Sequence, residues 1–431
     1  MTNPIRVGLL GCGVVGAATA RLLLEEADEL ARRAGAPIEL GLVAVREVSK
    51  QRDVALPSGI LTADARAVVT DPAIDVVVEV IGGIEPARDL LIEAARNKKH
   101  IVTANKELLA TLGHEVLGAA EGAGVDLLFE ASVAGGIPII RPLKESLAGD
   151  RVRRVLGIVN GTTNFILTRM SETGESFAEA LGEAGARGYT ELDPSADIEG
   201  FDSASKLAIL SSIAFNARVV AGDVLREGIT QISSADMQAA HELGYEIKLL
   251  AVAEQDEGKV SARVHPAMVP RTHPLASVRD VFNAVFIEGE RSGELMFLGR
   301  GAGGDATASA VVGDIVEIAR NMQTGARSVG CTCYHSDANI RSASEIRVRY
   351  YVVLSVVDQP GVLAAVAGVF SKHGISISSV RQEGFGSEAT LVLITHSGSE
   401  GHHSNIFLEL EALPVVKAVT SKIRVIGTVE G

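Results

Sequence analysis

The feature that most constrains the fold is a glycine-rich turn at residues 11–16. The segment "IRVGLLGCGVVGAATARLLLEE", which begins at Ile5, runs from an apolar strand through this turn into an Ala- and Leu-rich helix. Gly11 allows a tight turn, Gly13 lets the backbone approach a pyrophosphate, and Gly16 lets helix and strand pack closely. The start of the helix adds the positive end of a dipole. The arrangement predicts a dinucleotide-binding Rossmann domain.

Length and composition extend this prediction to the whole chain. The chain has 431 residues, which is too many for one core and suggests three domains at about 150 residues each. Hydrophobic residues make up 47% but aromatic residues only 4%, as in parallel sheets of Val, Ile and Leu that helices cover. Strand-like runs at 74–83 and 100–109 flank a helical run at 85–99, which is the βαβ rhythm of a doubly wound sheet. We therefore expect an α/β protein.

Charge and cysteine content exclude several classes of protein. The net charge of −14 and the pI near 5.3 argue against nucleic-acid partners and anionic membranes. The sequence has neither an apolar run of about 18 residues nor the apolar core of a signal peptide. Three cysteines cannot form a disulfide framework, and Cys331-Thr-Cys333 is too sparse for a zinc site. We expect a reduced, cytoplasmic protein.

The end of the second strand bears on the choice of cofactor. In a Rossmann domain this position carries the acid that binds the ribose 2′-hydroxyl, but here the strand at 38–45 leads to Arg46. Lys50 and Arg52 follow, so the pocket suits a 2′-phosphate. The negative charge of the adjacent Glu47 argues against phosphate binding. NADP(H) is favoured and NAD(H) is possible.

An acidic segment at residues 191–206, "ELDPSADIEGFDSASK", ends on a single lysine, Lys206. One interpretation is a solvated loop in which Asp202 and Lys206 form a surface pair worth about 0.3–0.5 kcal/mol. The other is a polar site in which carboxylates hold a cationic substrate group and the lysine handles a proton. Lys106, at the end of "IVTAN", has the same two interpretations, a ligand contact or a solvated lysine at a helix start.

Changes in sequence texture suggest domain boundaries. We expect a Rossmann domain at 1–135, completed by a glycine loop and long helix at 301–325. An α+β catalytic and dimerisation domain should occupy 136–300. A polar connector at 326–347 would then lead to a regulatory domain at 348–431.

The segment from Ala184 to Lys206 closely resembles the signature of the homoserine dehydrogenase family. The glycine turn, "TANK", "NGTTN" and "GAGG-x-A-T" fit that family in the same order, so the resemblance covers essentially residues 5–325. The few residues before Ile5 leave no room for a fused kinase domain, which fits the monofunctional form. The resemblance implies reversible NAD(P)H-dependent reduction of L-aspartate 4-semialdehyde to L-homoserine, in the biosynthesis of threonine, methionine and isoleucine.

The resemblance also implies roles for individual residues. Lys206 matches the catalytic proton donor and Lys106 the second active-site lysine. Glu191 and Asp202 match residues that bind the amino-acid end of the substrate, with Asp202 also part of the catalytic group and Asp197 as a supporting carboxylate. The acidic segment then becomes a cradle for the substrate, and a lysine ammonium beside the carbonyl can stabilise the oxygen and deliver the proton.

Cofactor and cation sites follow from the glycine turn, the strand ends and the resemblance. The expected cofactor contacts are Gly11, Gly13, Val14, Val15, Gly16, Arg46, Lys50, Thr103, Lys106, Gly188 and Gly303. The family's monovalent-cation site, for Na⁺, would fall on Glu130, Val133, Gly135 and Ile137. A purely structural glycine turn is the alternative there.

The last part of the chain resembles the ACT domain, a ferredoxin-like module that binds amino acids between paired copies. Its strand and helix pattern has the order βαββαβ, and "DQPG" forms the turn into the first helix. The resemblance implies feedback inhibition by L-threonine bound at Asp358, Gly361 and nearby backbone, in a homo-oligomer, either dimer or tetramer. A domain that only assists oligomerisation is the alternative.

Two other functions compete with a dehydrogenase. A non-catalytic sensor of amino acids and nucleotides would have lost Lys206 or Asp202, and both are present. An oxidoreductase that forms an acyl-enzyme needs a nucleophilic cysteine. The cysteines here are Cys12 in the cofactor turn and the pair in the connector, which disfavours that chemistry.

Overall fold

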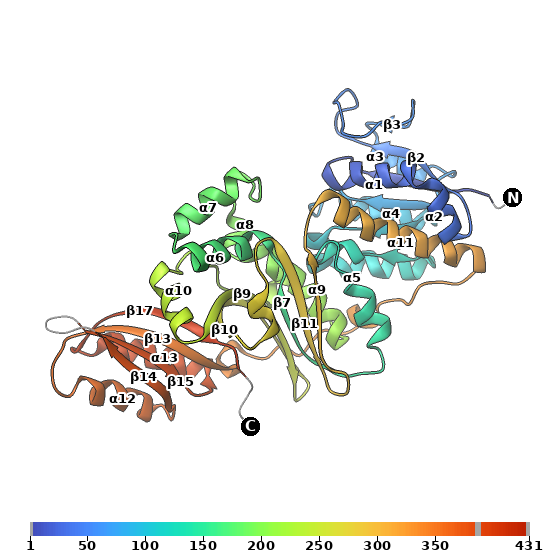
Figure 1. Cartoon of the computed structure of the whole chain (residues 1–431). Helices are drawn as coiled ribbons and strands as arrows, with labels where there is room; N and C mark the ends of the chain where they lie inside the picture. Colours follow the sequence, from blue (N-terminus) through green and yellow to red (C-terminus); the bar gives the residue numbers. More distant parts are fainter. Residues whose placement is uncertain (1–2, 384–388, 428–431) are drawn as a thin grey trace.

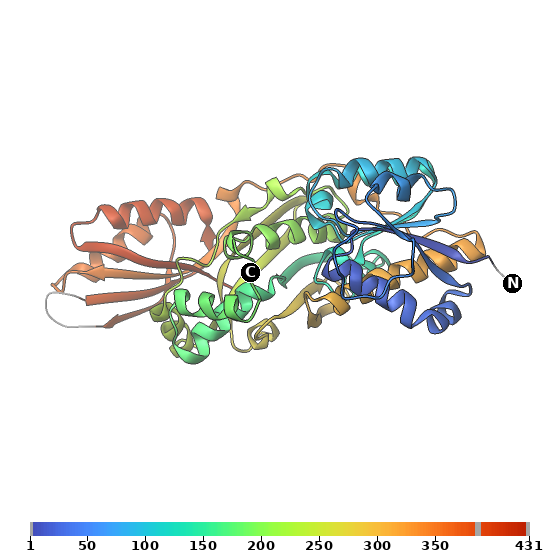
Figure 2. The same cartoon turned by 90° about the horizontal axis from the view of Figure 1, so that it is seen from above.

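The computed structural model describes residues 3–383 and 389–427. Figures 1 and 2 show three units in a row, with the N-terminal unit at one end, the C-terminal unit at the other and a central unit between them. These units correspond to a parallel sheet, a mixed sheet and a small C-terminal α/β layer.

The N-terminal unit is a doubly wound parallel sheet with strand order β3-β2-β1-β4-β5-β6. This order confirms the predicted Rossmann fold. Val7 and Leu9 have no exposed surface, as expected for a strand covered on both faces. Its strands are β1 (Ile5–Leu10), β2 (Ile38–Ala44), β3 (Leu61–Thr62), β4 (Val76–Glu79), β5 (His100–Thr103) and β6 (Leu127–Leu128). Its helices are α1 (Val14–Glu25), α2 (Ala27–Ala34), α3 (Ala65–Thr70), α4 (Ala87–Arg96) and α5 (Lys106–Ala123).

A helix from much later in the chain completes this unit. Helix α11 (Gly304–Thr324) lies against α1, as Figure 1 shows. Val311, Ile315 and Ile318 on α11 are fully buried in the same apolar cluster as β1. The chain therefore leaves the N-terminal unit after β6 and returns to it after the central unit.

The central unit places helices against a mixed sheet. Its strands are β7 (Val152–Ile158), β8 (Leu225–Arg226), β9 (Tyr245–Asp256), β10 (Lys259–Pro270), β11 (Phe282–Gly289) and β12 (Gly293–Arg300). Its helices are α6 (Gly161–Thr173), α7 (Phe177–Ala186), α8 (Ser195–Ile198), α9 (Phe201–Phe215) and α10 (Ser234–Glu242). A short π-helical turn at Pro142–Ser146 precedes β7.

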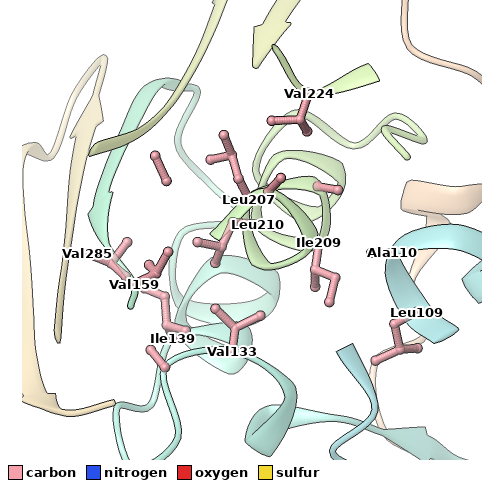
Figure 3. Close-up of a cluster of buried hydrophobic side chains, with 14 of the residues drawn as sticks. Leu109, Ala110, Val133, Ile139, Val159, Leu207, Ile209, Leu210, Val224 and Val285 are labelled. Atoms are coloured by element: carbon pink, nitrogen blue, oxygen red, sulfur yellow. The ribbon is translucent and has the colours of Figure 1, made fainter. Parts of the chain in front are cut away.

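Helix α9 runs through the core of the central unit. Leu207 and Leu210 have no exposed surface, and they pack with Val159 and Ile139 in the cluster that Figure 3 shows. Because Leu207 packs in this cluster, α9 is held in place and the position of the adjacent Lys206 in the central unit is fixed. The side chain of Lys206 is only 11% exposed.

The C-terminal unit has the order βαββαβ apart from one additional two-residue strand, which confirms the predicted ACT fold. Its strands are β13 (Arg347–Val356), β14 (Ile377–Glu383), β15 (Ala389–Thr395), β16 (Gly398–Ser399) and β17 (Val416–Val425). Its helices are α12 (Val362–Lys372) and α13 (Glu400–Ala412). Leu354, Val366 and Ile406 form part of its own buried core.

The central and C-terminal units share one sheet, which the sequence pattern did not suggest. Strand β17 pairs with β10 through Ala267↔Arg424 and Met268↔Val425, so the central and ACT strands form a single 11-stranded sheet. The alternation of apolar and polar residues within a strand does not show which strand lies beside it. The sequence therefore could not predict this short parallel pairing at the edge of β10. The C-terminal unit is thus joined to the central sheet as well as to the connector.

The connector is docked on the central unit along much of its length. Val260 N–H donates to the Asn339 carbonyl at 2.8 Å, and Arg341 N–H donates to the Val260 carbonyl at 2.7 Å. Tyr334 is 8% exposed. A polar, Gly- and Ser-rich composition predicts a free linker, but backbone pairing and one buried aromatic residue hold this segment in place.

The structure differs from the sequence-based expectation of a reduced chain. Cys331 and Cys333 form a disulfide, with their Cα atoms 5.2 Å apart, within the range that a disulfide spans. Cys12 is a free thiol. Among the residues that the structure describes, no helix is both long and apolar enough to cross a membrane.

Candidate active site

The glycine turn has the geometry that a dinucleotide requires. Gly11 has a φ of +100°, which favours glycine, and a Cβ at Gly16 would lie 2.3 Å from the Gly11 carbonyl oxygen. A Cβ at Gly13 would meet no atom within 4 Å, so the backbone there faces open space. The turn is therefore closed toward the sheet and open toward a ligand.

That open space is a cavity of about 1000 Å³ at the carboxyl ends of the parallel strands. A cavity of this size accommodates a dinucleotide, because small-molecule sites typically measure about 300–1,000 Å³. The expected contacts Gly11, Gly13, Val14, Arg46 and Lys50 all line it. It also includes residues from the loop after β4 and Gly304 at the start of α11.

The basic side chains at the end of β2 differ in their roles. The Arg52 guanidinium donates to the carbonyls of Glu47 and Lys50, both at 2.5 Å, so it braces its own loop. Within residues 3–383 and 389–427, the structure records no acceptor for the side chains of Arg46 and Lys50. These two cations are thus available to an anionic group of the cofactor.

Six expected cofactor contacts do not line the cavity in the described structure, namely Val15, Gly16, Thr103, Lys106, Gly188 and Gly303. Val15 lies on α1, one residue beyond the lining. The Thr103 hydroxyl is buried and donates to Glu79 at 2.6 Å. Gly188 and Gly303 occupy turns with φ of +73° and +123°, beside α7 and α11 respectively. Gly304 comes close to the nucleotide turn, since a Cβ there would be 3.3 Å from the Val14 carbonyl oxygen.

Glu79, which the sequence analysis did not single out, organises the loop at the cavity. Its carboxylate accepts from the N–H groups of Ile81 and Gly82 at 2.9 and 3.0 Å. Burial raises the pKa of Glu79, and the hydrogen bonds from Thr103 and the loop oppose that rise only in part. Asn105 donates to the Gly83 carbonyl at 2.6 Å, which ties the same loop to the residue before Lys106.

The acidic segment and both predicted lysines meet at Asp202. Lys206 Nζ lies 2.7 Å from Asp202 Oδ2, and Lys106 Nζ lies 3.1 Å from Oδ1. Asn160 Nδ2 donates to Asp202 Oδ2 at 2.9 Å and to Asp197 Oδ1 at 2.6 Å. The N-terminal ends of α5, α6 and α9 therefore meet, and they bring Lys106 and Lys206, 100 positions apart in the sequence, into one cluster.

The charges in this cluster support one another. Burial raises the pKa of Asp202, but the ammonium groups of Lys206 and Lys106 outweigh it and hold the pKa below its usual range. The charge of Asp202 raises the pKa of Lys106 despite partial burial. Asp197 behaves differently, since burial raises its pKa more than its hydrogen bond from Asn160 lowers it.

Lys206 is oriented by two acceptors. Its Nζ donates to the Val159 carbonyl at 2.7 Å in addition to Asp202. An ammonium group has three N–H donors, so one donor remains for a substrate oxygen. The half-exposed Lys106, with its side chain 44% exposed, lies on the open side of the same carboxylate.

Two groups of predicted residues stand apart from this cluster. Glu191 is exposed, and the structure gives its carboxylate no partner among the described residues. At the other end of the molecule, Gly361 precedes α12 with a φ of +92°, and Asp358 accepts a long hydrogen bond of 3.5 Å from Gln382. Both residues lie in the exposed turn that the "DQPG" motif predicts.

The residues predicted to bind a monovalent cation surround the turn after Glu130. The Glu130 carboxylate accepts three backbone N–H groups, from Ile139 and Ile140 on Oε1 and from Arg141 on Oε2, at 2.6–2.9 Å. A carboxylate has about four lone-pair sites, so one site on Oε2 remains. The carbonyls of Val133, Gly135 and Ile137 accept no backbone hydrogen bond from the described residues. This donor set fits a cation that binds oxygen.

Asn160 is the residue of the cluster that sequence reasoning missed. It begins the "NGTTN" motif and caps α6, with its side-chain oxygen accepting from Thr163 N–H at 2.9 Å. An Asn before a helix predicts a cap, and its amide nitrogen then points away from the helix to the two carboxylates. The signal was present in the sequence, but it indicated the helix start and not the site.

A Rossmann cavity, a buried lysine beside a carboxylate and a C-terminal ACT fold together define a class of protein, a nicotinamide-nucleotide-dependent oxidoreductase with a regulatory domain. Comparison with known proteins identifies the family. Residues 11–130 match "Homoserine dehydrogenase, NAD binding domain", residues 138–316 match "Homoserine dehydrogenase", and residues 350–415 match "ACT domain".

Similar proteins extend over nearly the whole chain. Homoserine dehydrogenase from Corynebacterium glutamicum is 50% identical over 98% of this chain and 96% of its own length. The crystal structure of a homoserine dehydrogenase from Thiobacillus denitrificans superposes with a TM-score of 0.93, at 41% identity over 98% of both chains. A hyperthermophilic archaeal homoserine dehydrogenase mutant in complex with NADPH matches 73% of this chain and 98% of its own, with a TM-score of 0.62 and 28% identity. The chain belongs to the homoserine dehydrogenase family, whose members are oxidoreductases that act on a CH–OH group.

Proposed function

We propose that Lys206 is the proton donor and acceptor in the interconversion of L-aspartate 4-semialdehyde and L-homoserine, with Asp202 and Lys106 completing the catalytic group. When bound, the nicotinamide cofactor supplies or accepts the hydride. The single observation that supports this assignment is the Asp202 carboxylate shared between two lysines at 2.7 and 3.1 Å. In the reducing direction, negative charge grows on the aldehyde oxygen, and the remaining N–H of Lys206 stabilises and then protonates it.

The carboxylates give the substrate its orientation in this proposal. Asp202 and Asp197 face the ammonium group of the substrate, and Asn160 holds both carboxylates in position. Lys106 offers a cation for the substrate carboxylate or for the cofactor. Glu191, which is exposed and has no partner within residues 3–383 and 389–427, would join the site when substrate binds and the segment around it closes. In the reverse direction Lys206 must give up a proton before it can act as a base.

For the cofactor, we propose NADP(H) in preference to NAD(H). Arg46 and Lys50 line the cavity at the end of β2 without acceptors of their own among the described residues, and Arg52 braces their loop. Guanidinium and ammonium groups suit a 2′-phosphate. The glycine turn and α1 would hold the pyrophosphate through Gly11, Gly13, Val14, Val15 and Gly16.

The remaining expected cofactor contacts are assigned to loops at the edge of the site. Thr103, Gly188 and Gly303 would contribute backbone groups, because the Thr103 hydroxyl is committed to Glu79 and glycine has no side chain. A monovalent cation, Na⁺, would be held by the carbonyls of Val133, Gly135 and Ile137 and by the free lone pair of Glu130. Such a cation would fix the turn that links the N-terminal and central units, and no proton transfer depends on it.

The regulatory proposal is that L-threonine binds at the ACT fold through Asp358, Gly361 and nearby backbone and inhibits the enzyme. It rests on the exposed "DQPG" turn and on the family match to an ACT domain. Among the described strands, the outer edge of β14 has no neighbour, which suits pairing of ACT units between subunits, so we propose a dimer or tetramer. We also propose a cytoplasmic location, as expected for a biosynthetic enzyme of this kind.

The experiment that tests these proposals together is a spectrophotometric assay of L-homoserine oxidation. We expect turnover with both cofactors, a higher kcat/KM with NADP⁺ than with NAD⁺, and inhibition by L-threonine. A higher kcat/KM with NAD⁺ would overturn the cofactor assignment alone. Unchanged rates in saturating L-threonine would overturn the regulatory assignment alone, so the proposals fail separately.

A further inference from the structure

A small cavity lies at the seam between the central and C-terminal units, where β10, β17 and β13 run side by side in the shared sheet. Its volume is about 50 Å³, and since a water molecule needs about 10–15 Å³ on this scale, it holds a few waters or one small anion. Basic side chains dominate its walls, and we call it the arginine cavity. They are Arg154, Arg263, Arg347, Arg349, Arg424 and His265.

Carboxylates balance only part of the positive charge. Within the described residues, the ion pairs are Arg154 and Arg263 with Glu254, Arg154 with Glu288, and Arg424 with Glu227 and Glu400. Arg347 and Arg349 have no carboxylate partner in the described part of the chain. Arg347 donates to the Ser397 carbonyl and Arg349 to the Thr395 carbonyl, both at 3.2 Å. The five arginines and these four carboxylates leave one net positive charge, and Arg347 and Arg349 carry the guanidinium groups without an ion pair among the described residues.

Three buried polar atoms of residues that line the cavity also lack a hydrogen-bond partner in the described structure, namely Arg154 Nε, Arg263 Nε and His265 Nε2. The Arg263 residue is 6% exposed, and its Nε–H has no hydrogen-bond acceptor. His265 is 2% exposed, and its Nε2 has no hydrogen-bond partner. Buried polar groups in native proteins are nearly always paired with protein, water or a ligand, so Arg263 and His265 on β10 offer one unused donor and one unused ring nitrogen.

The protonation state of the His265 ring determines which kind of hydrogen-bond partner Nε2 requires. His265 Nδ1 lies 2.8 Å from the Pro266 carbonyl oxygen, and because a carbonyl only accepts, Nδ1 carries the proton. Burial, together with the charges of Arg424 and Arg263, lowers the pKa of His265 well below its usual value, so the ring is neutral. Nε2 is therefore a bare acceptor, and its partner must be a hydrogen-bond donor.

A ligand that satisfies all these groups must present negatively charged oxygens to the arginines and an O–H group to His265. We propose that the arginine cavity binds one hydrogen phosphate ion, with its oxygens on Arg263, Arg347 and Arg349 and its O–H on His265 Nε2. Guanidinium groups recognise phosphate oxygens through directed pairs of N–H donors. Sulfate has the same shape and charge at neutral pH but no O–H, so it leaves His265 unpaired.

The bound ion would connect the two units that form the shared sheet. Arg263 and His265 belong to β10 in the central unit, and Arg347 and Arg349 belong to β13 in the C-terminal unit. Direct pairing between β10 and β17 involves only two residue pairs. An anion that binds both strands would therefore stabilise the docking of the ACT fold on the central unit.

The test measures thermal unfolding of the full chain during titration with inorganic phosphate or with sulfate at neutral pH and constant ionic strength. Saturating NADPH is present throughout, which keeps phosphate out of the cofactor cavity. We expect a saturable rise in the unfolding midpoint with phosphate, a much smaller rise with sulfate, and one phosphate site per chain by calorimetric titration. Equal effects of the two anions, or no saturable effect of phosphate, would overturn the proposal.

Two variants test whether the effect of phosphate on thermal unfolding arises at the arginine cavity. Arg349→Gln and Arg347→Gln each remove a guanidinium group that has no carboxylate partner among the described residues and should weaken phosphate binding by about tenfold or more. Lys372→Gln is the matched control, because this exposed lysine pairs with Glu409 and does not line the cavity. It should retain the phosphate effect. If one arginine variant fails to fold, the other still decides, and an unchanged phosphate affinity in a folded variant would contradict the proposal.

Discussion

Asp202 and Lys206 lie one turn apart on α9, with 2.7 Å between the carboxylate oxygen and the ammonium nitrogen, in a site where both side chains are about nine-tenths buried. The same carboxylate holds Lys106, which comes from a helix of the N-terminal unit. This ion pair thus differs from a surface pair worth a few tenths of a kcal/mol, because burial and a second lysine fix its geometry. It also joins the proposed substrate residues to the unit that contains the cofactor cavity.

The Asn160 amide should be required for this geometry. In Asn160→Ala the carboxylates of Asp197 and Asp202 lose their shared donor, so we expect kcat to fall by about 10- to 100-fold through misorientation of the catalytic group. The affinity for NADPH should change little. Loss of the α6 cap also costs about 1 kcal/mol of stability, so the control is Ser233→Ala, which removes the cap of α10 outside the site. Equal kcat losses in the two variants would show that Asn160 acts only through the helix.

The proposed preference for NADPH should depend on Arg46. Arg46→Asp replaces a cation at the 2′-phosphate position with a like charge, so kcat/KM with NADPH should fall far more than with NADH. The ratio of the two values is the measurement. Arg291→Asp, in an exposed turn of the central unit, makes the same charge change as a control. An unchanged ratio in Arg46→Asp would mean that this residue does not contact the phosphate.

Glu79 should make stability depend on pH. Burial raises the pKa of Glu79 in the folded protein above its value in the unfolded chain, so the folded state retains the proton over a range where the unfolded state has lost it. The stabilisation is full below the unfolded pKa and is lost as pH rises through the folded pKa. Glu79→Gln keeps the shape without ionising, so its unfolding midpoint should rise relative to wild type as pH increases from about 4.5. The opposite trend would contradict the stated shift.

The proposed inhibition by L-threonine should be lost when the turn at Asp358 is altered in the full chain. Asp358→Ala removes a carboxylate from the exposed turn before α12 and should abolish the response to threonine while leaving uninhibited turnover intact. A coupling of about 1–3 kcal/mol would correspond to a 5- to 150-fold change in substrate affinity. Inhibition by the same threonine concentrations in the variant would indicate an effector at the active site instead.

A point variant is a sharper test here than removal of the C-terminal unit. A chain truncated near Ser344 would retain the cofactor and substrate residues and the docked connector, and the sequence predicts that it is active without a threonine response. However, truncation also uncovers the edge of β10 at Ala267 and Met268, where β17 pairs. Loss of activity in the truncated chain would therefore reflect an exposed sheet edge as readily as a regulatory role.

The sequence predicted the parts of the site that local rules determine. The glycine turn is fixed by φ at Gly11 and by close packing at Gly16, both of which depend on residues a few positions apart. The ion pair of Asp202 and Lys206 follows from helical spacing. The fold of each unit follows from strand and helix periodicity.

What the sequence did not predict depends on contacts between distant segments. The approach of Lys106 to Asp202 requires α5 and α9 to pack together. The two hydrogen bonds from Asn160 to the carboxylates require α6, α8 and α9 to meet. In the sequence, Glu79 is one polar residue in an apolar strand. Only the structure shows that its buried carboxylate holds the loop after β4. The shared sheet and the docked connector likewise arise from pairing between units, which periodicity within one segment cannot encode.

The central claim is that Lys206 moves the proton in the dehydrogenase reaction. The most direct test is the turnover of Lys206→Ala in L-homoserine oxidation, alongside its affinity for NADPH and the control Lys372→Ala, which changes an exposed lysine of the ACT fold. We predict a loss of kcat of about 10²- to 10⁴-fold, the range for a positioned acid or base, with cofactor affinity little changed. A folded Lys206→Ala enzyme with near-normal kcat would contradict the assignment.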